Sequence, residues 1–206
     1  IAWDHLPAAY REATKPLWQQ YLEYMSKTID DFRNFFKPSK QKARFDILKA
    51  IDDSLLITKK HLQNHDIDVT VDKECNASNL QTGACAYEVE GYESEFKQVL
   101  INIVNNAREA IAEQAESRDM REKWIHIHVL RTEKELIITV QDNGGGIPEA
   151  ILQDIFEPYH STKYAQQGTG LGLYMSKLII ERNMQGQLSV RNASEGAEFK
   201  IVLRID

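Results

Sequence analysis

Apolar residues recur along this chain at two spacings, and each spacing predicts one type of element. Recurrence every three or four residues predicts amphipathic helices over 17–36, 47–63, 93–115 and 170–183. Alternation and short apolar runs predict strands near Phe45 and over 66–71, 86–89, 124–130, 136–140, 187–191 and 198–204. Helices and strands are mixed without regular alternation. We therefore expect an α+β fold, a two-layer α/β sandwich in which helices cover one mixed sheet, preceded by a long helix.

The first long helix, over 17–36, ends before Pro38, and a polar linker follows it over 37–42. We therefore place a boundary there, with a helical segment over 1–40 and a second domain over 41–206. The apolar face of the helix is too large to be left in water. It either packs on the same chain or pairs with another helix in a dimer, and periodicity leaves both open.

Composition excludes some functions. The 206 residues carry a formal net charge of −6, which gives no support to nucleic-acid binding as the main role. No apolar run approaches the roughly 18 residues of a membrane span, so no membrane segment is expected. The chain begins with Ile1 and shows no signal peptide, which suggests a fragment of a longer protein.

Cysteine usage points to a reducing compartment. Cys75 and Cys85, the only two cysteines, lie in one polar stretch, and we expect reduced thiols in a cytosolic loop. A disulfide closing that short loop is the alternative. The triplets that begin at Asn76 and Asn192 match the glycosylation pattern, which occurs often by chance and matters only in secreted proteins.

Two glycine-rich segments flank a polar loop that carries Lys163. The first, over 142–146, follows a predicted strand, and the second, over 168–172, runs into a predicted helix. Glycines let main chain approach a ligand closely, and N–H groups at a helix start attract anions. The sequence therefore predicts a nucleotide pocket under a lid, with Lys163 adding positive charge near the phosphates. A solvated loop lysine is the alternative for Lys163.

Asn102 and Asn106 lie four residues apart in the predicted helix 93–115 and so share a face. A carboxamide oxygen can bind Mg²⁺, which combines few protein ligands with phosphates and water. The alternative is a hydrogen-bonded pair on the helix surface.

Asp142 ends a strand, where a carboxylate can accept a hydrogen bond from the amine of adenine and reject guanine. The alternative for Asp142 is a tight turn.

The order of these motifs resembles the ATP-binding catalytic domain of sensor histidine kinases, with the nitrogen-sensor-like subgroup nearest. Residues 98–111 are similar to the family's N box, 142–148 and 168–181 to its two glycine boxes, 155–163 to its F box and lid, and 186–199 to its closing hairpin. Residues 25–38 resemble the end of the dimerisation domain's second helix.

The resemblance implies the Bergerat-type fold of the gyrase, chaperone and mismatch-repair ATPases, with ATP and Mg²⁺ as cofactors. It implies transfer of the γ-phosphoryl group to a histidine of a dimerisation domain, then relay to a response regulator receiver domain. It also implies a homodimer formed through the N-terminal helix and a cytoplasmic location within a larger sensor. Asn102 and Lys163 would be catalytic and Asn106 would bind the metal. The implied nucleotide-binding set is Asn102, Asn106, Asp142, Gly144, Gly146, Ile147, Phe156, Thr162, Lys163, Gly168, Thr169, Gly170, Leu171, Gly172 and Leu173.

Two positions depart from the family pattern. No histidine upstream of residue 25 has the expected phosphoacceptor context; His5 is followed by Leu6 and Pro7. Glu109 stands where many relatives carry a basic residue.

Two other functions stay open: an ATP-hydrolysing switch of the gyrase class, or a nucleotide-binding module without catalysis. The first needs a Glu base where this chain has Asn102, and Asn cannot accept a proton at neutral pH.

Overall fold

The computed structural model of the chain describes residues 42–76, 85–118, 120–158 and 170–205. The predicted helix over 17–36 and the proposed 1–40 segment lie outside these ranges. So do four predicted site residues of the lid and second glycine segment, namely Thr162, Lys163, Gly168 and Thr169.

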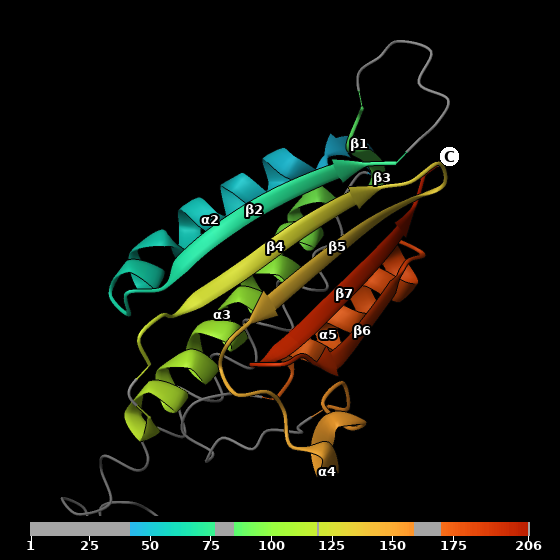
Figure 1. The fold of residues 1–206 in the computed structure, drawn as a ribbon. Coiled ribbons are helices and arrows are strands. Elements are labelled where there is room, and N and C mark those ends of the chain that lie inside the picture. Colours follow the sequence, from blue (N-terminus) through green and yellow to red (C-terminus); the bar gives the residue numbers. More distant parts are fainter. Residues whose placement is uncertain (1–41, 77–84, 119, 159–169, 206) are drawn as a thin grey trace, which may run out of the picture.

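A five-stranded mixed sheet forms one layer of the domain, in the order β2-β4-β5-β7-β6. β2 runs parallel to β4, and all other neighbours are antiparallel. A separate antiparallel pair, β1 with β3, lies near the start of the longest helix (Figure 1). The strands are β1 (Ala43–Asp46), β2 (Asp68–Cys75), β3 (Glu88–Gly91), β4 (Trp124–Arg131), β5 (Glu135–Asp142), β6 (Gln187–Asn192) and β7 (Ala197–Arg204).

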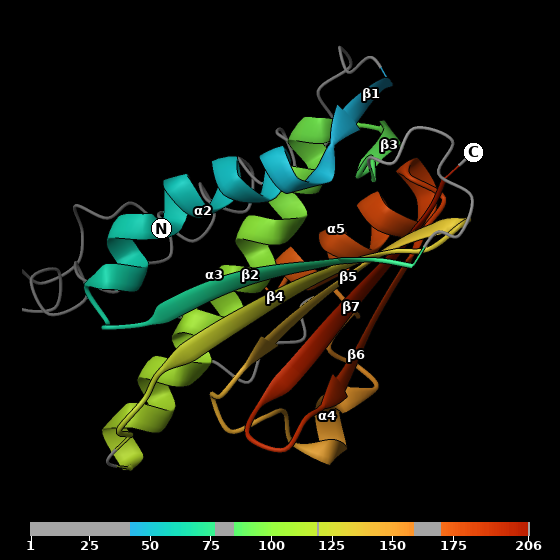
Figure 2. The same cartoon turned by 45° about the horizontal axis from the view of Figure 1, so that its top comes forward.

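The second layer consists of the three longest described helices, which cover one face of the sheet, whereas a four-residue helix lies beyond the ends of the strands (Figures 1 and 2). Buried and half-buried residues alternate along β5, with Leu136, Ile138 and Val140 facing the helices. The predicted two-layer α+β sandwich with a mixed sheet is therefore confirmed. The helices are α2 (Ile47–Gln63), α3 (Glu93–Ser117), α4 (Glu149–Leu152), α5 (Gly172–Leu178) and a π-helical turn η2 (Ile179–Asn183) that continues α5.

Helix α3 is the central helix of this layer, because it contacts α2, α5 and β5. Its apolar side chains recur at three- and four-residue spacing and are fully buried, as at Phe96, Leu100, Ile103 and Ile111. Helix α2 packs beside it and is capped by Asp46, whose Oδ1 accepts a hydrogen bond from the Leu48 main-chain N–H at 2.8 Å. The sheet and α2 therefore hold α3 firmly in place.

The predicted elements in these ranges all form, with small shifts at their ends. The helix predicted over 47–63 matches α2, whereas β2 starts two residues later than predicted and runs on to Cys75. Helix α4 and the π-helical turn were not predicted. None of the described helices, including the 25-residue α3, combines the length and apolar character needed to cross a membrane.

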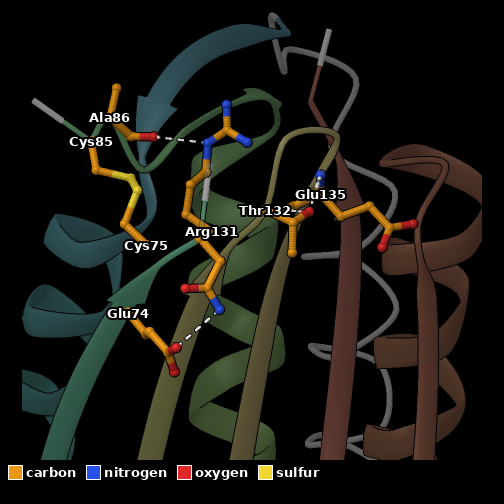
Figure 3. The surroundings of a disulfide bond; sticks show 8 residues. Glu74, Cys75, Cys85, Ala86, Arg131, Thr132 and Glu135 are labelled. Carbon is orange, nitrogen blue, oxygen red and sulfur yellow. Dashed lines mark hydrogen bonds between the residues drawn. A yellow bond between two sulfur atoms is a disulfide. The ribbon is translucent and has the colours of Figure 1, made fainter. Parts of the chain in front are cut away.

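The expectation of reduced cysteines is wrong for this structure, because Cys75 and Cys85 form a disulfide (Figure 3). The bond joins the end of β2, an edge strand, to the segment that leads into β3, with the two Cα atoms 6.4 Å apart. Beside it, the Arg131 Nε–H donates to the Ala86 carbonyl oxygen at 3.3 Å. Sequence separation alone could not show that β2 ends within reach of Cys85.

Candidate functional site

One stripe of α3 runs beside both glycine-rich segments. Its residues lie at four-residue spacing, which keeps them on one side of a helix with 3.6 residues per turn. With a rise of 1.5 Å per residue, the stripe extends about 18 Å along the axis. Asn102, Asn106 and Ala110 each directly precede a residue of the buried apolar stripe, so the two stripes lie side by side on the helix. The stripe consists of Asn102, Asn106, Ala110 and Gln114.

Asn102 joins α3 to the start of α5. Its Nδ2 donates to the Gly172 carbonyl oxygen and to the Ser176 Oγ, both at 3.3 Å. Its Oδ1 accepts from Gln98 Nε2 at 3.1 Å. Ser176 is fully buried, and its hydroxyl donates to the same Gly172 oxygen at 2.9 Å. The structure therefore brings Asn102 to the second glycine segment, with its side chain hydrogen-bonded between two helices.

Asn106 lies one turn further along the stripe and is half-buried. Within the described residues its side chain has no hydrogen-bond partner, in contrast to that of Asn102. No three His, Cys, Asp or Glu side chains of the described ranges gather into a metal site. A hard cation held here would therefore take oxygen ligands from Asn106 together with a ligand's phosphates and water, the coordination that Mg²⁺ favours.

Asp142 ends β5 and is only 3% exposed. Its Oδ1 accepts from the main-chain N–H of Gly144 at 2.8 Å and from that of Ala197 at 3.3 Å. Burial raises the pKa of the Asp142 carboxyl, and these two hydrogen bonds oppose that rise. Both bonds use the same oxygen. Oδ2 is left without a protein partner among the described residues and can accept from a ligand.

The first glycine segment packs tightly against α3. A Cβ on Gly144 would lie 2.8 Å from the Cβ of Ala110 and from the main-chain N of Ile111. Gly145 and Gly146 have positive φ angles of 87° and 80°, which disfavour other residues. Close approach of a ligand was expected at these glycines, whereas the structure shows that helix α3 itself excludes a side chain at Gly144.

Two residues near Asp142, Asn143 and Gly196, make contacts that were not foreseen from the sequence. The Asn143 side chain accepts from Trp124 N at 3.0 Å and donates to the Glu122 carbonyl oxygen at 2.9 Å, which ties the loop to the start of β4. Gly196, in the β6–β7 turn, lies directly against the main chain and carboxylate of Asp142, where a Cβ would clash. Neither residue has a local sequence signature, because both contacts join distant parts of the chain.

The second glycine segment is described from Gly170, whose φ is 65°. Leu171 is buried, and Gly172 begins α5. Phe156 is half-buried and packs against the hydrophobic core, with the Lys177 Nζ 4.9 Å from its ring centroid. The other predicted contact residues, Ile147 and Leu173, also pack at the edge of the core. Of the second glycine segment, Gly172 contacts the stripe, through Asn102.

A family model described as "Histidine kinase-, DNA gyrase B-, and HSP90-like ATPase" matches residues 91–206, more than half of the chain. The chain belongs to this family. Curated relatives that it matches include sensor kinases. The two-component sensor PprA of Pseudomonas aeruginosa is 34% identical over 171 residues, which are 77% of this chain and 16% of PprA. AtoS of Escherichia coli is 28% identical over 204 residues, 95% of this chain and 31% of AtoS.

Solved structures agree with this membership. The catalytic domain of histidine kinase ThkA has a TM-score of 0.63 and 27% identity, and the match covers 80% of this chain and 95% of that one. ThkA in complex with the response regulator TrrA has a TM-score of 0.65 at 22% identity, over 99% of this chain and 52% of ThkA, which supports the fold alone. The chain spans only about a sixth to a third of PprA and AtoS.

On this ATPase-family domain, a hollow of about 540 Å³ opens on the helix-free face of the sheet. It contains none of the residues predicted for the nucleotide. Its lining comes from β4, β5, β6 and β7 and includes the ion pair between Arg191 and Glu198. The predicted site lies instead on the opposite, helix-covered side, where its residues come from α3, α5 and the end of β5.

Proposed function

We propose that this chain is the ATP-binding catalytic domain of a sensor protein histidine kinase. It binds Mg-ATP under a lid and transfers the γ-phosphoryl group to a histidine of a dimerisation domain, for relay to a response regulator. The main support is the α3 stripe, on which Asn102 touches the segment that begins α5 and Ala110 touches the glycine loop after β5. One rigid helix thereby sets the spacing of the two ends of the site.

In this proposal each part of the site has one role. Asn106 binds Mg²⁺, the free Oδ2 of Asp142 accepts from the adenine amine, and the N–H groups over 170–172 contact phosphate. Lys163 on the lid adds positive charge. Phosphoryl transfer asks the protein mainly to position groups and to neutralise charge, so these residues need no covalent chemistry of their own.

Transfer is favoured over hydrolysis by Asn102. A hydrolysing enzyme of the gyrase class would need a Glu base at this position to activate water. A carboxamide cannot accept that proton, and here its Nδ2 donates to Gly172 and Ser176. We therefore assign Asn102 to positioning the phosphate-binding segment, and we expect water attack on ATP to be slow.

The proposals on partners and location rest on the resemblance to sensor histidine kinases, and ThkA was solved in complex with a response regulator. We propose a response regulator receiver domain as partner, a homodimer formed through the predicted helix 17–36, and a cytoplasmic location within a longer sensor. The proposed division at residue 40 separates that helix from the ATP-binding domain over 41–206.

The test follows the γ-phosphate of labelled ATP after incubation with the chain and Mg²⁺. We expect bound ATP to stay largely intact, and any label on the protein to be acid-labile, as a phosphohistidine is. The control is Asn106→Ala, which should remove any transfer. Sustained release of inorganic phosphate near 1 per second, typical of slower enzymes, would contradict the proposal and favour a hydrolysing switch.

A further inference from the structure

The β6–β7 hairpin also holds the glycine loop, in addition to α3. The Gly145 N–H donates to the Glu195 carbonyl oxygen at 2.9 Å. Two residues later in the loop, both main-chain groups of Ile147 bond to the side chain of Asn192. The Asn192 Oδ1 accepts from Ile147 N at 2.8 Å, and the Asn192 Nδ2 donates to the Ile147 carbonyl oxygen at 2.8 Å. One carboxamide therefore satisfies both main-chain groups of Ile147, as a neighbouring strand would.

The same side chain limits the loop at two more points. A Cβ on Gly146 would lie 3.0 Å from the Asn192 Oδ1, so the loop already packs closely against the carboxamide. The Asn192 Nδ2 also lies 3.3 Å from Oε1 of Glu149, the first residue of α4. These contacts fix the end of the loop and the start of the helix that follows it.

We propose that Asn192 is a positioning residue for the nucleotide, which holds Gly146 and Ile147 in the conformation that receives the base. This inference rests on the proposed function. A loop that is already fixed in its binding conformation loses little conformational freedom when the ligand binds, so the affinity is higher. The triplet Asn192-Ala193-Ser194 stood out in the sequence only as a chance glycosylation pattern, and the structure gives its amide a specific use.

Asn192 is exposed at the end of β6, so its removal leaves the hydrophobic core intact. That exposure allows the loop contact to be separated from the fold. A matched control lies one residue earlier: Arg191 is also exposed and pairs with Glu198 at 2.7 Å on the same hairpin, without contact to the glycine loop. Asn192→Asp is a second variant, which keeps an acceptor for Ile147 N–H but loses the donor.

The experiment measures the Kd for Mg-ATP by calorimetry, the thermal midpoint, and exchange of the Ile147 amide hydrogen without nucleotide. Asn192→Ala should raise the Kd on the order of tenfold and speed that exchange by a similar factor, because both hydrogen bonds are lost. Mg-ADP binding should weaken equally, since the contact lies at the base end of the site. Asn192→Asp should also weaken binding, because its charge faces the Ile147 carbonyl and Glu149. Arg191→Ala should leave the Kd within about twofold.

Two results would overturn the inference. The first is an unchanged Kd in Asn192→Ala and Asn192→Asp while the wild-type chain binds Mg-ATP, which would leave the proposed function standing. The second is an equal loss of affinity in Arg191→Ala, which would show a general effect of the hairpin. A wild-type chain that binds no Mg-ATP would overturn the proposed function, and this inference with it.

Discussion

Replacing Asp142 with Ala is expected to weaken Mg-ATP binding by about a hundredfold. This factor corresponds to the free energy of one lost hydrogen bond to a charged group together with the cost of the disturbed loop. The carboxylate is buried, and its Oδ1 also holds the main-chain N–H groups of Gly144 and Ala197. The variant loses the acceptor for the adenine amine and leaves two buried donors unpaired. Calorimetric titration with Mg-ATP measures the change.

The control for this prediction is Asp142→Asn, which keeps an oxygen for the two N–H groups but does not titrate. Burial raises the pKa of Asp142, and an amine donor of adenine favours its ionised form. Wild-type affinity should therefore fall as the pH drops through this raised pKa, and the affinity of Asp142→Asn should lack that dependence. Full affinity in Asp142→Ala would remove the adenine contact from the site.

Replacing Asn106 with Ala is expected to weaken ATP binding by a similar, about hundredfold, factor when Mg²⁺ is present. Asn106 is half-buried, and its side chain has no hydrogen-bond partner among the described residues. The substitution should therefore cost the fold little stability. With a chelator present, the variant and the wild type should bind ATP almost equally. Titrations with and without Mg²⁺ separate the two effects.

Asn105 offers a matched control, because it has the same side chain one position along α3 and points about 100° away from the stripe. Asn105→Ala should leave Mg-ATP affinity nearly unchanged. If Asn105→Ala and Asn106→Ala weaken binding equally, the loss comes from the helix rather than from the metal. If neither has an effect, Asn106 is not a ligand.

Much of the fold follows from local pattern, because apolar spacing and capping are local properties. The apolar spacing of α2 predicts its bounds, and its start coincides with the cap at Asp46 that the structure shows. The end of β2 is different: residues 72–75 are polar and lie on an edge strand, so no alternation marks them. The strand order, with β2 parallel to β4, depends on packing across the whole sheet, and no local pattern encodes it.

The candidate site likewise contains residues that carry a local sequence signal and residues that do not. Asn102, Asn106 and Asp142 are proposed for the site from the sequence because their spacing and neighbours carry a chemical meaning. The contact between Asn192 and Ile147 has no such signal, because an exposed Asn before a turn is common and the two residues lie 45 positions apart in sequence. The cysteines were misjudged for a related reason: composition predicts a compartment but gives no distance between Cα atoms.

The central claim is that this chain binds Mg-ATP along the α3 stripe and selects adenine through Asp142. Calorimetric titration of the wild-type chain with Mg-ATP and then with Mg-GTP tests it most directly. Guanine has a carbonyl where adenine has an amine, so it would face the carboxylate with no hydrogen to donate. We predict one ATP site, and GTP binding weaker by about a hundredfold or more. No binding of ATP, or equal binding of both nucleotides, would contradict the account.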